Sequence, residues 1–123
     1  MADETIDFSL LVGSGIPTRN FRAGEAIFKE GDPATELYVI KSGRVGIQLG
    51  NRLLDTLEPN SIFGEMALID SARRSAAAIA ISDTALVTIS EKQFLFLVSQ
   101  TPFFALKVMR ILARRLRAMN NVL

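Results

Sequence analysis

The segment FGEMALIDSARRSA, residues 63–76, combines residue types that could bind an anion. Gly64 lets the backbone turn and approach a ligand closely. The run EMALI that follows is long enough for about one helical turn, and the free N–H groups at a helix start attract anions. Arg74 lies nine residues after Glu65, so a loop can return its guanidinium to that helix end, where its donors match phosphate oxygens.

Glu65 is a carboxylate beside this candidate anion site, where like charges would repel each other. Its presence makes sense if the ligand carries hydroxyl donors next to its phosphate, as a sugar phosphate or a nucleotide with a free ribose hydroxyl does. Ser75 would add a hydroxyl donor. The alternative is a Glu65–Arg74 ion pair that only closes an ordinary loop, and the residue types leave both interpretations open.

The composition argues against an enzyme, a metal centre and a disulfide framework. The chain of 123 residues has no cysteine and no histidine, which removes thiolate ligands, the commonest metal ligand and the usual general base. No clustered spacing of acidic residues indicates a carboxylate site for Mg²⁺ or Ca²⁺. The candidate segment holds no nucleophile with an activating base. We therefore expect a binding protein, not an enzyme, with no metal and no cofactor.

Charge and hydropathy predict a cytoplasmic protein. The N-terminal stretch MADETIDF carries acids where a signal peptide carries basic residues, and the uncharged runs are too short to span a bilayer. All 13 acids lie in residues 1–101 with nine bases, a net charge of −4, whereas residues 102–123 carry five bases and no acid. Such a basic tail indicates either contact with nucleic acid or a membrane, or the solvated face of a helix.

Short strands followed by two helices are expected to position the candidate segment. Turn residues recur through the first two thirds of the chain, and a GN turn at residues 50–51 predicts a hairpin. Val45, Ile47 and Leu49 alternate on one face of the strand before that turn. Short strands without long helices between them predict an antiparallel barrel or roll. The strand-like runs are residues 25–28, 36–40, 44–49, 52–57, 76–81 and 85–90.

The last third of the chain predicts two helices. Ser90 is typical of an N-cap for a helix over residues 91–100, and Thr101 with Pro102 predicts the start of a second one. In the second helix, one apolar stripe repeats at spacings of 4, 3, 4 and 3, formed by Ala105, Met109, Leu112, Leu116 and Met119. Another apolar set remains to face the barrel, formed by Phe103, Phe104, Leu106, Val108 and Ile111. A helix that is apolar on two sides needs two partners, so we expect a homodimer through the stripe. The alternative is that the stripe packs on its own barrel.

Residues 63–76 resemble the phosphate-binding cassette of cyclic nucleotide-binding domains. That family includes the regulatory subunits of cyclic-AMP-dependent protein kinase, cyclic-nucleotide-gated channels and bacterial Crp/Fnr regulators of the cyclic-AMP receptor type. The resemblance extends to FRAGEAIFKEGDPATELYVIKSGRVGI and covers roughly residues 21–117. It implies a mainly β fold with flanking α-helices: an antiparallel, jelly-roll-like β-roll (a double-stranded β-helix) with a short cassette helix and a long C-terminal helix. It also implies one domain over residues 1–123, with the roll at about 17–90 and the terminal helices at about 91–121.

The resemblance implies specific roles for the cassette residues. Glu65 would accept a hydrogen bond from the ribose 2′-hydroxyl, and Arg74 would pair with the cyclic phosphate oxygens. The remaining ligand-binding positions are Phe63, Gly64, Met66, Ala67, Ser75 and Ala76.

The sequence departs from the family pattern at two places. Arg73 stands where the family often has proline, and Ala77 and Ala78 stand where a second threonine often follows. We expect Arg73 to be solvated. Bacterial regulators also reach the purine from the long helix, and the candidates here are Arg115, Asn120 and Asn121.

These features predict a regulatory module that senses cyclic AMP, with cyclic GMP also compatible with Ser75, and that passes the signal through the C-terminal helix. Bacterial regulators of the family continue into a helix-turn-helix domain, for which no room remains before Leu123, so we expect no sequence-specific DNA binding. Two alternatives stay open. One is an interaction protein of the same fold that dimerises without a ligand, and the other is a Crp/Fnr-type transcription regulator that acts through a partner. The downstream protein is not identified by the sequence.

Overall fold

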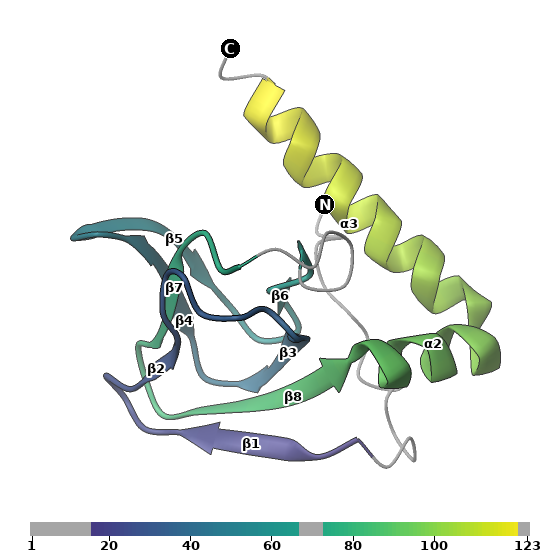
Figure 1. Ribbon diagram of the computed structural model, residues 1–123, viewed down its shortest axis with the longest axis horizontal. Helices are drawn as coiled ribbons and strands as arrows, with labels where there is room; N and C mark the ends of the chain where they lie inside the picture. The colour runs from purple at the N-terminus through teal and green to yellow at the C-terminus, as the bar shows by residue number, and fades with distance from the viewer. Residues whose placement is uncertain (1–15, 67–72, 121–123) are drawn as a thin grey trace.

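The computed structural model describes residues 16–66 and 73–120, with the backbone alone at residues 119 and 120 (Figure 1). Two four-stranded antiparallel sheets form the roll, in the orders β1-β8-β3-β6 and β2-β7-β4-β5. The strands are β1 (Thr18–Phe21), β2 (Ala26–Phe28), β3 (Glu36–Ser42), β4 (Val45–Leu49), β5 (Arg52–Leu57), β6 (Ile62–Phe63), β7 (Ala77–Ala80) and β8 (Thr84–Ser90).

The expected mainly β roll is confirmed, and the six predicted strands lie within two residues of their expected ends. β1 and β6 were not predicted. β4 and β5 form the expected hairpin, but the register shifts between Ile47 and Gln48, so that Leu54 has no partner residue opposite it. Beyond this shift Leu49 is 45% exposed, whereas Val45 is buried.

Alternation along three strands divides the apolar interior into two clusters. We call the cluster between the first sheet and the helices the helix-side core; it contains Leu37, Val39, Ile62, Val87, Ile89, Leu97, Phe104, Val108 and Ile111. We call the cluster between the two sheets the site-side core; it contains Tyr38, Ile40, Val45, Phe63, Ala78 and Leu86. Neighbouring residues of β3, β6 and β8 therefore point to different cores.

Two helices follow β8. Helix α2 (Glu91–Gln100) starts with a capping box, in which Ser90 Oγ accepts from the Gln93 N–H and the Gln93 side chain accepts from the Ser90 N–H. This confirms the predicted N-cap. Helix α3 (Pro102–Asn120) begins at the predicted proline and runs back past the side of the roll that carries β6 (Figure 1).

The buried face of α3 is narrower than the sequence predicts. Phe104, Val108 and Ile111 lie in the helix-side core, as expected. Phe103 and Leu106 do not face the barrel, because 52% and 39% of their surfaces are exposed.

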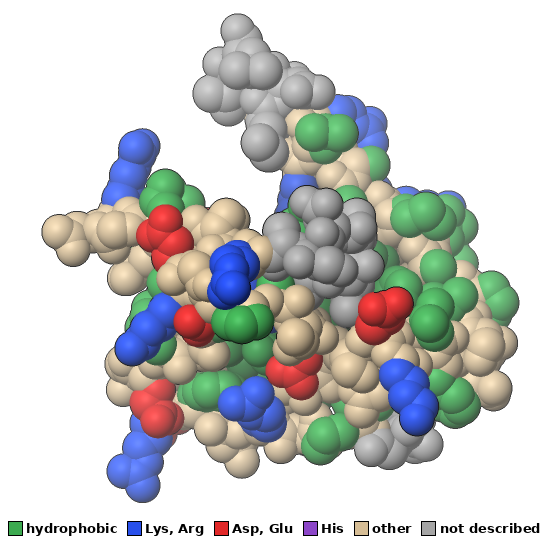
Figure 2. Space-filling model, viewed as in Figure 1, with side chains coloured by type: hydrophobic (Ala, Val, Ile, Leu, Met, Phe, Trp, Pro, Cys, Tyr) green, Lys and Arg blue, Asp and Glu red, His purple; other side chains and the backbone are tan. Residues whose placement is uncertain are grey.

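The predicted dimer stripe is split between core and solvent. Leu112 packs partly against the helix-side core, as the alternative for the stripe requires, whereas Met109 and Leu116 are 58% and 59% exposed. The side chain of Met119 lies outside the described part of the structure. Figure 2 shows hydrophobic side chains gathered over α2 and α3.

Within the described ranges, no single helix is long and apolar enough to cross a membrane. Residues 91–100 and 102–118 meet those criteria only when they are taken together across a bend of 118°.

Candidate functional site

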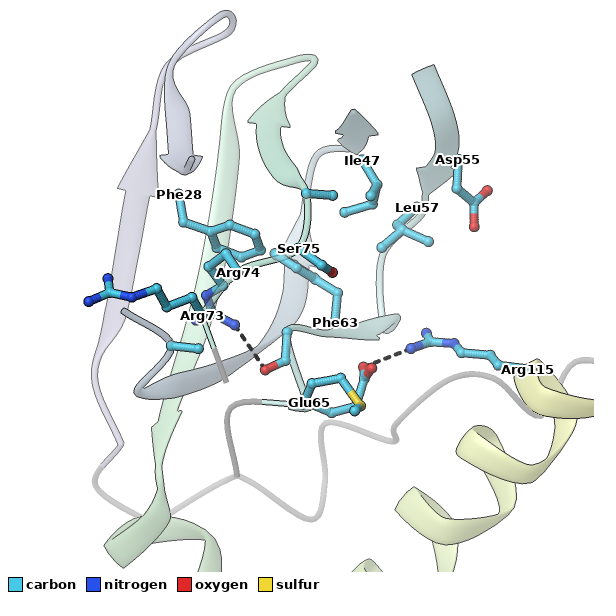
Figure 3. A pocket seen from close by; sticks show the side chains of 14 residues that line it. Phe28, Ile47, Asp55, Leu57, Phe63, Glu65, Arg73, Arg74, Ser75 and Arg115 are labelled. Carbon is cyan, nitrogen blue, oxygen red and sulfur yellow. Dashed lines mark hydrogen bonds and ion pairs between the residues drawn. The ribbon is translucent and has the colours of Figure 1, made fainter. Parts of the chain in front are cut away.

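A cavity of about 260 Å³ lies beside the cassette and brings most of the predicted site residues together (Figure 3). Of the ligand-binding set, it is lined by Phe63, Gly64, Glu65, Met66, Arg74, Ser75 and Ala76. Arg115 reaches it from α3. Ala67, the rest of the predicted cassette turn and Asn121 lie outside the described residues, as does the side chain of Asn120.

Arg74 is buried at the cavity wall, with 7% of its surface exposed. Its Nη1 donates to the Gly64 carbonyl at 3.1 Å and its Nη2 to the Glu36 carbonyl at 2.7 Å. Its Nε–H is buried and has no hydrogen-bond partner among the residues that the structure describes. A buried donor without an acceptor costs free energy, which makes this guanidinium a candidate contact for an anionic ligand.

The cassette loop is anchored through its backbone to the EGDP turn. The Gly31 N–H donates to the Arg74 carbonyl at 2.8 Å, and the Arg74 N–H donates to the Asp32 carbonyl at 2.9 Å. Arg73 is exposed, as expected, and its Nη1 donates to the Gly31 carbonyl at 3.0 Å. The sequence marked EGDP only as a turn and missed this role, because backbone bonds between distant residues leave no side-chain signal.

The Glu65 carboxylate pairs with α3. Arg115 Nη1 donates to Glu65 Oε1 at 2.8 Å, and its Nη2 donates to the Ile62 carbonyl at 2.6 Å. The two side chains are largely buried, at 27% and 14% exposure for Arg115 and Glu65. The alternative of a Glu65–Arg74 ion pair is therefore wrong, since the arginine bound to Glu65 comes from the long helix.

Gly64 has a positive φ of +75°, and a Cβ at this position would lie 2.9 Å from Arg74 Nη1. Glycine therefore meets two needs at once, because it adopts the left-handed conformation and admits the guanidinium beside it. This agrees with the expected turn and close approach at Gly64.

Aromatic residues that the sequence did not select surround Arg74. Its guanidinium carbon lies 4.1 Å from the Phe28 ring centre and 5.6 Å from that of Tyr38. Tyr38 also stacks on Phe63, with ring centres 5.1 Å apart. Burial and the nearby Glu36 carboxylate raise the pKa of Tyr38, which the positive charge of Arg74 partly offsets.

The opposite wall of the cavity is apolar apart from one carboxylate. Ile47 and Leu57 line it together with Asp55, all from the β4–β5 hairpin (Figure 3). A ligand with an anionic group, a hydroxyl and a flat apolar part matches this division. Among the described residues, no group of three or more acidic side chains could hold a metal ion.

Comparison with known proteins shows the family of the chain. The family model of the cyclic nucleotide-binding domain matches residues 18–101, so the chain belongs to the cyclic nucleotide-binding domain family. The chain is 38% identical to the cyclic AMP receptor protein of Thermus thermophilus over 122 residues, covering 95% of this chain and 55% of that protein.

Two solved structures show the same fold. The catabolite activator protein of Thermus thermophilus superposes with a TM-score of 0.81 at 35% identity, over 98% of this chain and 57% of that one. A protein of a cyclic-GMP-dependent signalling pathway that regulates bacterial phytopathogenesis gives 0.76 at 26%, over 95% of this chain and 96% of that one. The chain spans about half the length of the curated relatives it matches.

Proposed function

We propose that residues 1–123 form one cyclic AMP-sensing regulatory module and that the cavity beside the cassette binds the nucleotide. The main support for this proposal is the Nε–H of Arg74, which is buried and has no hydrogen-bond partner among the described residues. Arg74 lines the same cavity as Glu65. A cyclic phosphate supplies the missing acceptor, and a ribose hydroxyl supplies a donor for the carboxylate.

The proposed roles follow the cassette residues. Arg74 binds the cyclic phosphate, assisted by Ser75 and the backbone N–H of Ala76. Glu65 accepts a hydrogen bond from the ribose 2′-hydroxyl, and Phe63, Gly64, Met66 and Ala67 complete the wall. The base lies toward Ile47 and Leu57, where Arg115, Asn120 or Asn121 covers it.

Transmission runs through α3, because Arg115 links this helix directly to Glu65. A ligand that bonds to Glu65 changes the free energy of that link, and it shifts the position of α3 by its differential affinity for the two states. The exposed part of the stripe, at Met109 and Leu116, then forms a homodimer contact. The module works in the cytoplasm without catalysis and hands the signal to a protein that remains to be identified.

Cyclic GMP is the second candidate ligand, supported by the compatible Ser75 and by the similarity to a protein of a cyclic-GMP-dependent pathway. Calorimetric titration with cyclic AMP and cyclic GMP tests both. Micromolar or tighter binding is expected for cyclic AMP, and a higher affinity for cyclic GMP would reassign the ligand.

Arg74→Ala should weaken binding by about 2–5 kcal/mol, because the phosphate loses its buried partner. The control is Arg22→Ala, which removes an exposed arginine that does not line this cavity and should bind like the unaltered protein. Absence of heat and of thermal stabilisation with either nucleotide up to millimolar concentration would exclude the sensor. It would favour a dimerising interaction protein or a Crp/Fnr-type regulator that acts through a partner.

A further inference from the structure

Among residues 16–66 and 73–120, the buried charge of Arg74 has no carboxylate partner. None of the ion pairs among residues 16–66 and 73–120 involves this guanidinium, although only 7% of the residue is exposed. An isolated buried charge is costly. The compensating groups are two backbone carbonyls and the faces of Phe28 and Tyr38.

Aromatic faces suit an arginine that must receive an anion. A carboxylate partner would occupy the guanidinium donors and repel the ligand, whereas a neutral ring stabilises the charge and occupies no donor. Nη1 and Nη2 each use one hydrogen for the Gly64 and Glu36 carbonyls. The Nε–H and the second hydrogen of each Nη are the donors that these two bonds do not use. The orientation of the guanidinium therefore decides which of its hydrogens stays available to a ligand.

The two rings are themselves held in place. Phe28 and Tyr38 stack with centres 5.9 Å apart, and Tyr38 is 4% exposed within the site-side core. Phe28 lines the cavity, whereas Tyr38 is not among the residues that line it. An effect of Tyr38 on an anion must therefore pass through Arg74 or through the core, not through ligand contact.

We propose, building on the cyclic nucleotide site proposed above, that Phe28 and Tyr38 are positioning residues. They fix the orientation of the Arg74 guanidinium, so that the hydrogens not bonded to the Gly64 and Glu36 carbonyls, the Nε–H among them, remain for the ligand phosphate. Phe28 is the principal one, because its ring centre lies 4.1 Å from the guanidinium carbon and that of Tyr38 lies 5.6 Å away. The rings act on the phosphate end of the ligand and leave its base unaffected.

The binding test compares Phe28→Leu with Phe94→Leu. Phe94 is also partly buried, but it packs against Phe104 in the helix-side core, with ring centres 5.6 Å apart. Phe28→Leu should weaken cyclic AMP binding about tenfold, and Phe28→Trp should restore it, since tryptophan is the strongest cation–π partner. Phe94→Leu should bind within about twofold of the unaltered protein, because it touches no part of the site.

Adenosine, which lacks a phosphate, separates positioning from contact. Its weak binding, followed by NMR titration, should be the same in Phe28→Leu as in the unaltered protein. Equal weakening of adenosine and cyclic AMP would mean that Phe28 only contacts the ligand, and it would overturn the proposal.

A measurement on the ligand-free protein tests the positioning role of Phe28 separately from cyclic nucleotide binding. In ¹⁵N-labelled protein, the Arg74 Nε–H should give a slowly exchanging signal that the Phe28 ring shifts upfield. Phe28→Leu should abolish that shift, whereas Phe94→Leu should keep it. An unchanged signal in Phe28→Leu would overturn the positioning role even if cyclic AMP binds, and an altered signal would support it even if no cyclic nucleotide binds.

Discussion

Arg115 on α3 donates one hydrogen bond to the Glu65 carboxylate at 2.8 Å and a second one to the Ile62 carbonyl at 2.6 Å. These bonds join residues 50 and 53 positions apart, and they fix the second half of the long helix to the start of the cassette. The same carboxylate is the group proposed to read the ribose. The proposed ligand recognition and the position of the helix therefore depend on the same side chain.

Replacing Arg115 should loosen α3. Arg115→Gln leaves the largely buried Glu65 carboxylate without its charged partner, at a cost of about 1–3 kcal/mol. Differential scanning calorimetry should show a melting temperature several degrees lower, and hydrogen exchange should rise in the last turns of α3. Arg110→Gln is the control on the same helix, since Arg110 lies over the exposed Phe103 ring, and it should change stability by at most about 0.5 kcal/mol. Equal behaviour of the two variants would contradict the role given to Arg115.

Gly64→Ala should damage both the fold and the site. The positive φ of +75° strains any residue with a Cβ, and the Cβ would also lie 2.9 Å from Arg74 Nη1 and 3.3 Å from the Tyr38 ring. Gly24→Ala provides the matched control, because φ there is +91° and nothing lies within 4 Å of the added Cβ. Chemical denaturation should show a loss of about 1–2 kcal/mol for Gly24→Ala and a larger one for Gly64→Ala. Only Gly64→Ala should weaken nucleotide binding, and unchanged binding in that variant would count against the close approach.

Tyr38 should ionise above its ordinary pKa of 10.0, because burial and the Glu36 carboxylate both oppose the phenolate. It is the single tyrosine of a chain without tryptophan, so absorbance near the tyrosinate band follows this residue alone. Above the ordinary pKa the unfolded chain loses the proton first. The stabilisation is therefore complete below that pH and is lost as the pH rises through the folded pKa. A folded-state titration that coincides with that of the urea-unfolded chain would refute the burial of this hydroxyl.

Met109→Glu should prevent the proposed dimer without unfolding the monomer. Met109 is 58% exposed, so a charge there costs the isolated chain little but would be buried in a contact between two copies. Light scattering after gel filtration should report a dimer for the unaltered protein and a monomer for the variant. Phe103→Glu is the control, because Phe103 is 52% exposed but lies outside the stripe. Dissociation by Phe103→Glu alone would move the contact to that side of the helix.

The sequence was most informative where local rules decide the structure. Strand-like runs between turn residues predicted six strands, and Ser90 and Pro102 marked the starts of both helices. β1 was not predicted, because three of its four residues are exposed and its pairing with β8 joins segments that are distant in the sequence. β6 has two residues, too few for a period to be read.

The site could be predicted in its residue types but not in its pairings. The closeness of Gly64 and Arg74 followed from glycine and loop length, and the structure agrees. The partner of Glu65 could not be found in that way, because Arg115 is brought to it by the packing of α3 on the roll. The contacts of Phe28 and Tyr38 with Arg74 could not be predicted either, because in the sequence both are ordinary strand residues. Likewise, the periodicity of α3 gave the apolar positions but not the side that Phe103 and Leu106 occupy.

β3 separates the helix-side core from the site-side core. Leu37 and Val39 lie in the helix-side core, whereas Tyr38 and Ile40 lie in the site-side core. Inserting or deleting one residue in this strand would exchange the two faces. The ring contact of Tyr38 with Arg74 and the packing of the helices on β3 would then be lost together. The hairpin tip at Gly50 contributes to neither core, because it is exposed and nothing lies within 4 Å of a Cβ added there. Relatives of this chain should therefore vary in length at that tip and keep β3 at constant length.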